Sequence, residues 1–250
     1  MIFKQLFEPA SSTYTYLLGC ESSGLAVLID PVTETVERDL AVVRDLGLQL
    51  AYTVETHIHA DHLTSAQILK ALTASRIAAP KLDGMSCVDS AIEEGRPLLI
   101  GDIVLHPMWT PGHTPHHHAY LIERSETMRL FSGDALLIDG CGRTDFQNGD
   151  AGALYRSVRE KMFKLSDETL VYPAHDYQGR RVSSIGQEKT RNPRLGSDKT
   201  LDDFKRIMAE LKLPLPKKMH YFVSGNTRCG EYVPDVPEEL QSACGITIQG

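Results

Sequence analysis

The hydrophobic pattern along the chain predicts two successive sets of strands with helices between and after them. Short segments rich in apolar and β-branched residues are predicted to be strands, and these are residues 13–18, 25–30, 50–56, 77–79, 103–109, 119–123, 129–132 and 170–173. Apolar residues at helical spacing predict helices over residues 36–46, 61–72, 151–165, 184–190 and 201–211. Strands followed by helices, twice over, predict an α/β protein with two sheets and outer helices.

Composition narrows the class of protein. The 250 residues are 42% hydrophobic and 24% charged, which is typical of one globular domain, with or without a small appendage. No apolar run approaches the roughly 20 residues needed to cross a bilayer. Residues 1–8 resemble an opening strand rather than a signal peptide, so we expect a cytoplasmic protein without membrane contact. The net charge of -7 argues against nucleic-acid binding.

The cysteines and the end of the chain carry weaker signals. The five cysteines are scattered and form no C-x-x-C pair, so we expect reduced thiols rather than disulfides or a zinc ribbon. Cys141 lies between two glycines, which favours a structural turn over a nucleophile. The segment after Pro214 is rich in proline and glycine and is predicted to be loop with short extended pieces.

Candidate chemistry begins directly after the predicted strand 50–56. His57, His59, Asp61 and His62 lie within six residues, and their side chains suit zinc, iron or manganese. On an extended segment alternate side chains share a face, so His57 and His59 can reach one ion. The other two follow the turn and can face the same cavity from another side.

Three more potential ligands follow later strands. His113, Asp134 and His175 each lie at the end of a predicted strand, in a loop that contains glycine or proline. Such loops let the backbone approach an ion closely, and the strands fix the ligand geometry.

Together, these motifs resemble those of the metallo-β-lactamase fold superfamily over about residues 10–180. The resemblance implies an αββα sandwich of two mixed sheets with outer helices, and metals at one edge of the sheets. We expect one such domain over residues 1–250, with a C-terminal helical and loop extension from about residue 180.

The stretch 132–147 favours one chemistry within that superfamily. It is similar to the persulfide dioxygenase (sulfur dioxygenase, ethylmalonic encephalopathy protein-like) family, as are residues 172–177, 192–195 and 228–230. This resemblance implies oxidation of glutathione persulfide by O2 and water to sulfite and glutathione. The alternative is a glyoxalase II-like hydrolase of S-acylglutathione thioesters with two metals. A non-catalytic persulfide sensor is a third class, which no motif in the chain supports.

The family resemblance also implies a ligand set. One Fe(II) per chain would be held by His57, His113 and Asp134, a two-histidine, one-carboxylate face that leaves positions open for the persulfide sulfur and O2. The other ligand-type residues would then orient this site around a vacant second one, and these are His59, Asp61, His62 and His175. Because every ligand for a second metal is present, the sequence leaves its occupancy open.

Substrate residues are predicted from charge. Glutathione carries two carboxylates, so an acidic protein needs local positive charge to hold it. Arg143, on a glycine-rich loop past Asp134, is the first candidate, and Arg228, Arg191 and Arg194 are others. Tyr177 could donate a hydrogen bond near the sulfur, and Asp176 is expected to buttress the site. The family also implies a possible homodimer, while the run 116–118 of three histidines has no assigned role, with at most one expected to point inward.

Overall fold

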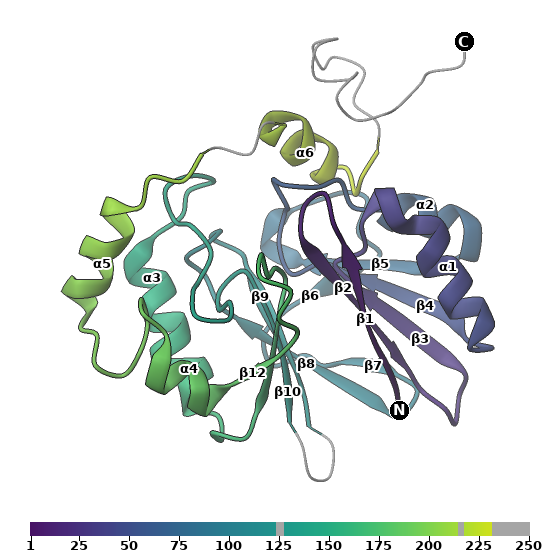
Figure 1. The fold of residues 1–250 in the computed structure, drawn as a ribbon. Coiled ribbons are helices and arrows are strands. Elements are labelled where there is room, and N and C mark those ends of the chain that lie inside the picture. Colours follow the sequence, from purple (N-terminus) through teal and green to yellow (C-terminus); the bar gives the residue numbers. More distant parts are fainter. Residues whose placement is uncertain (124–127, 215–217, 232–250) are drawn as a thin grey trace.

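The computed structural model describes residues 1–123, 128–214 and 218–231, and its two six-stranded sheets face each other between outer helices (Figure 1). The first sheet is built in sequence order from β1 (Ile2–Glu8), β2 (Thr13–Gly19), β3 (Leu25–Ile29), β4 (Gln49–Val54), β5 (Arg76–Pro80) and β6 (Ser90–Ile92). Its first two pairings are antiparallel and the later ones parallel, so the sheet is mixed.

The second sheet is also mixed and runs in reverse order. Its strands are β12 (Ser183–Ser184), β11 (Leu170–Pro173), β10 (Arg129–Gly133), β9 (His118–Ile122), β8 (Ile103–Trp109) and β7 (Leu98–Ile100). Only the β10–β11 pairing is parallel among these described strands.

Helices cover the outer face of each sheet (Figure 1). They are α1 (Val36–Asp45), α2 (Ala66–Thr73), α3 (Ala151–Arg156), α4 (Ile185–Arg191), α5 (Leu201–Glu210) and α6 (Met219–Asn226). The first two lie on the first sheet, the next three lie on the second, and α6 lies beyond one edge of the sandwich. Within the described residues, no helix is both long and apolar enough to cross a membrane.

The strands are apolar on both faces because alternate residues pack against different layers. On β3, Val27 and Ile29 point into the core between the sheets, whereas Ala26 and Leu28 pack under α1 and α2. On β10, Phe131 faces the inner core while the preceding leucine packs under α3 and α5. Both sheets are therefore buried on both sides, and the predicted αββα architecture is confirmed.

Most predicted elements are present, the short strands β6, β7 and β12 were not predicted, and two predicted helices differ in extent. The helix predicted over residues 61–72 begins only at Ala66, because residues 57–65 form the loop that presents ligand-type side chains. The helix predicted over residues 151–165 is α-helical only to Arg156. It continues as a π turn, Ser157–Lys161, and a 3-10 turn, Met162–Lys164.

Two predictions are wrong, one for the segment after Pro214 and one for the cysteines. The segment after Pro214 is not all loop, because α6 forms there and packs tightly: a Cβ at Gly225 would lie 2.5 Å from Leu63 Cδ1. The cysteines are not all reduced, because Cys87 and Cys229 form a disulfide. The structure contains two free, buried thiols in the residues it describes, while residue 244 lies outside them.

Candidate metal centre

The predicted ligands meet at one edge of the sandwich because each follows the end of a strand. His57 follows β4, His113 follows β8, Asp134 follows β10 and His175 follows β11. Glycine at position 133 is required by the backbone, which has φ +53° there, and by a close neighbour: a Cβ would lie 2.4 Å from a buried imidazole nitrogen. The chain thus brings together residues that are far apart in sequence.

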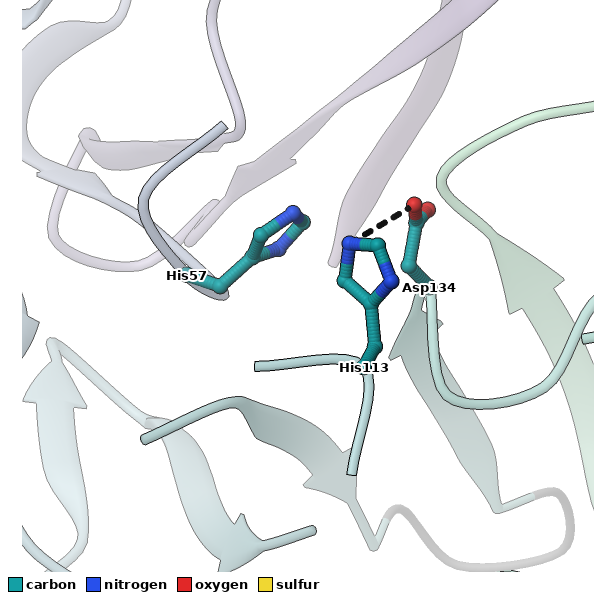
Figure 2. A group of neighbouring side chains, drawn as sticks. All are labelled: His57, His113 and Asp134. Atoms are coloured by element: carbon teal, nitrogen blue, oxygen red, sulfur yellow. Dashed lines mark ion pairs between the residues drawn. The ribbon is translucent and has the colours of Figure 1, made fainter. Parts of the chain in front are cut away.

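His57, His113 and Asp134 form the first group of potential ligands (Figure 2). One ligand atom from each lies within 4.8 Å of the others, and all three residues are buried. His113 Nε2 lies 3.3 Å from Asp134 Oδ2. The other carboxylate oxygen, Oδ1, is buried and receives no hydrogen bond from the described residues, so a positive ion would give it a partner.

Hydrogen bonds behind both imidazoles decide which nitrogen faces this centre. His113 Nδ1 lies 2.8 Å from the Arg143 carbonyl, which can only accept, so Nδ1 carries the proton and Nε2 offers its lone pair. Thr56 donates its hydroxyl to Asp30, so its oxygen accepts from His57 Nδ1 at 2.9 Å. Burial and the neighbouring imidazoles hold the pKa of His57 well below its usual value. In both rings Nδ1 is used for these hydrogen bonds, so Nε2 is the nitrogen available to a metal.

A second group lies beside the first and consists of His59, Asp61 and His62, whose ligand atoms also lie within 4.8 Å of one another. His175 Nε2 lies 3.4 Å from both Asp61 Oδ2 and Asp134 Oδ1, and so connects the groups. Buried nitrogens on His59 (Nδ1) and His62 (Nε2) have no hydrogen-bond partner within the described part of the chain. All the predicted ligand positions are thus assembled, including those for a second metal.

Sequence reasoning missed the carboxylates that support His59. Its Nε2 lies 3.1 Å from Asp30 Oδ1 and 3.3 Å from Glu55 Oε2. Burial opposes a charge on His59, but these two carboxylates outweigh it and raise the pKa well above its usual value. Asp30 directly follows β3, as the predicted ligands follow their own strands, so its position could have identified it.

A cavity of about 520 Å³ opens from the first group of ligands. That volume is in the range of small-molecule sites. Its wall includes Ile138, Phe146, Tyr177, Arg194 and Leu213, which combine apolar surface with a hydroxyl and a guanidinium.

The predicted substrate residues differ in how many of their hydrogen-bond donors are already used within the protein. Arg143 lines the cavity, but its guanidinium pairs with the Asp145 carboxylate at 2.6 and 2.7 Å and donates to two carbonyls of the segment after α5. Arg194 donates from Nη1 to the Cys141 carbonyl at 2.9 Å, and within the described chain its Nη2 has no acceptor. Arg228 is not among the residues that line the cavity.

The loop after His175 also lines the cavity. Tyr177 is 75% exposed, and its ring is stacked near that of His175, with centroids 6.1 Å apart. Asp176 accepts backbone N–H groups from Gln178 and Arg180 and pairs with the Arg180 guanidinium. The Arg180 guanidinium, which sequence reasoning also missed, is committed to Asp176 and Asp139.

Comparisons with known proteins agree with this geometry. The family model of the metallo-beta-lactamase superfamily matches residues 9–175. The human mitochondrial persulfide dioxygenase ETHE1 is 45% identical over 94% of this chain and 91% of its own length. The crystal structure of ETHE1 from Myxococcus xanthus has a TM-score of 0.88 and 47% identity, over 92% of this chain and all of that one.

A hydrolase is more distant. The hydroxyacylglutathione hydrolase of a Polaromonas species is 32% identical, over 92% of this chain and 90% of its own length. The higher identity to the persulfide dioxygenases agrees with the resemblance of residues 132–147. The chain belongs to the persulfide dioxygenase family of the metallo-β-lactamase superfamily.

Proposed function

We propose that the protein oxidises glutathione persulfide with O2 and water to sulfite and glutathione, using one Fe(II) held by His57, His113 and Asp134. The observation that carries this proposal is the buried group of two imidazoles and one carboxylate beside a cavity that His113 and Asp134 line. This donor set suits non-haem iron, and the identity to persulfide dioxygenases supports that metal and that substrate. The reaction balances as persulfide plus O2 plus water giving thiol plus sulfurous acid.

The chain would position the reactants around that centre. Bound Fe(II) would supply open coordination positions and a redox-active ion through which electrons pass from the persulfide sulfur to O2. The Arg143 carbonyl and the Thr56 hydroxyl fix the two imidazoles, while the apolar wall at Ile138 and Phe146 limits access of water. His59, Asp61, His62 and His175 would orient this site rather than hold a second iron.

We further propose that Arg194 anchors a glutathione carboxylate. Arg194 lines a cavity in which the other lining arginines, Arg143 and Arg180, are already paired with carboxylates. Tyr177, whose ring is stacked near that of His175, would donate a hydrogen bond near the sulfur. Arg143 would then act mainly by shaping the wall, and Arg228 is the least supported of the predicted substrate residues.

A thioester hydrolase remains the alternative because of one observation. The second group, His59, Asp61 and His62, can hold another metal, and a two-metal site is what hydrolysis by bridging hydroxide needs. The Polaromonas relative, a hydroxyacylglutathione hydrolase, shares 32% identity.

Oxygen uptake separates the two functions. Protein loaded anaerobically with Fe(II) and given glutathione persulfide should consume O2 and release sulfite, with one tightly bound iron per chain. S-lactoylglutathione should be hydrolysed slowly or not at all. Rapid thioester hydrolysis without oxygen uptake, together with two tightly bound metals, would contradict the proposal.

Three wider expectations stay predictions. They are location in the cytoplasm, a homodimer without nucleic-acid or membrane partners, and a single domain with an extension from about residue 180. The names of the relatives do not agree on location. The human protein has "mitochondrial" in its name, whereas the name of the Myxococcus xanthus structure gives no location.

A further inference from the structure

Two residues of the run of three histidines after Pro115, His117 and His118, are buried, which is more than expected, and His117 lies behind the metal centre. We propose that His117 is a positioning residue, which holds the main chain of Asp134 and the loop of His113 so that both ligands face one ion. The inference rests on the metal-binding role proposed above for His57, His113 and Asp134, and it concerns a side chain outside that ligand set.

The His117 imidazole connects two of the ligand-bearing segments. It is fully buried, its Nε2 accepts a hydrogen bond from the backbone N–H of Asp134 at 3.1 Å, and its Nδ1 lies 2.8 Å from Thr110 Oγ1. The approach is close because residue 133 is glycine: a Cβ there would lie 2.4 Å from His117 Nε2. With both nitrogens engaged, His117 is a support for the ligands and not a further ligand.

These contacts fix the tautomer of His117. A backbone N–H can only donate, so Nε2 must carry a lone pair. The neutral ring then has its proton on Nδ1 and donates it to Thr110 Oγ1. Thr110, which is fully buried, therefore sets the ring orientation that serves Asp134.

The backbone of the same segment reaches the remaining ligand loops. The His117 carbonyl accepts from Thr110 N at 2.9 Å and closes the loop on which His113 lies. The N–H of His118 donates to the Thr56 carbonyl at 2.8 Å, directly before His57. The His117 segment thus contacts all three chain segments that supply the proposed ligands.

The neighbouring His116 provides a matched control. His116 is partly exposed, and its Nδ1 lies 2.9 Å from Asp83 Oδ1, away from the ligands. A variant there changes the same residue type in the same run without touching Asp134.

The test compares two amide replacements at position 117. In His117→Gln the side-chain oxygen can occupy the place of Nε2 and still accept from Asp134 N–H. In His117→Asn the amide reaches only the place of Nδ1, so the Asp134 N–H loses its acceptor. Supporting contacts of this kind change metal affinity by about 10–100-fold.

We expect the dissociation constant for Co(II), measured anaerobically by chelator competition, to rise about 10–100-fold in H117N. It should rise less than about 3-fold in H117Q and in the control H116Q. The visible ligand-field bands of bound Co(II) should shift in H117N only. Equal affinities and spectra for H117N and H117Q would overturn the proposal, because the acceptor at Nε2 would then have no role.

A second pair of variants covers a failure of H117N to fold. Thr110→Val removes the partner of Nδ1 and Thr110→Ser keeps it, so only T110V should weaken Co(II) binding and shift its bands. The same affinity in both overturns the proposal. Wild-type protein that binds neither Co(II) nor Fe(II) would contradict the proposed function instead, since the ligand set itself would then be wrong.

Discussion

Oxygen atoms behind the two imidazoles determine the chemistry of the proposed ligands. The Arg143 carbonyl behind His113 and the Thr56 hydroxyl behind His57 each accept a hydrogen bond from Nδ1–H, which leaves both Nε2 atoms to face Asp134. The Thr56 hydroxyl donates its own hydrogen to Asp30, so only its lone pairs are available to His57. Asp30 thus acts on the metal centre indirectly: it orients the Thr56 hydroxyl, which in turn orients the His57 ring.

At the same scale, Arg194→Ala tests the substrate anchor. Loss of a charge-assisted hydrogen bond to a carboxylate costs about 1.5–3 kcal/mol, so kcat/KM for glutathione persulfide should fall about 10–100-fold. KM should carry most of the change, because the anchor lies away from the sulfur. Oxygen-uptake kinetics measure this, with the exposed Arg206, which pairs with Asp203 on α5, changed to alanine as control. An unaltered KM in R194A would show that the anchor is elsewhere.

The meeting of the proposed ligands at one edge could be predicted from sequence, and the hydrogen-bond partners behind them could not, for a physical reason. His57, His113 and Asp134 are residue types with metal chemistry at the ends of recognisable strands. The guanidinium of Arg143 was predicted to bind substrate, but Asp145 and two carbonyls of a distant segment take its hydrogen bonds. Such competition depends on three-dimensional neighbours, which the spacing of residues does not encode.

Among the elements, α6 has a role that the sequence did not predict. It holds the loop that carries His59 and His62. Asn226, the last residue of this helix, accepts from Thr64 N at 2.9 Å and donates to the carbonyls of both histidines at 2.9 and 2.8 Å. Nothing in the local pattern predicts this, since its partners lie more than 160 residues earlier. Most strands and outer helices, in contrast, followed from their own periodicity, although the short strands β6, β7 and β12 did not.

Asn226→Ala should therefore destabilise the protein and loosen the ligand loop. It leaves buried backbone groups without partners, at a cost of about 2–4 kcal/mol, and it should also weaken metal binding. Urea unfolding and Co(II) competition measure the two effects, and the exposed His220 on the same helix supplies the control variant H220A. A stability change no larger than that of H220A would contradict this role for α6.

For the whole molecule, the Cys87–Cys229 disulfide should be a large contribution to stability. It joins residues 142 positions apart, and in the chain-entropy account so long a loop stabilises by about 3–5 kcal/mol. Reduction with dithiothreitol should lower the free energy of unfolding of the wild type and leave that of Cys87→Ser unchanged. Equal effects of the reductant on both proteins, or reactivity of both thiols in unreduced protein, would show that the bond does not form.

The disulfide also divides the proposed ligands between two topological parts of the chain. The covalent ring that it closes contains His113, Asp134 and His175, whereas His57 and its neighbours lie on the N-terminal arm outside. An ion held by His57, His113 and Asp134 would therefore link the N-terminal segment to the disulfide-closed ring. Even an unfolded oxidised chain would keep His113, Asp134 and His175 inside one closed loop, and His57 would have to rejoin that loop as it refolds.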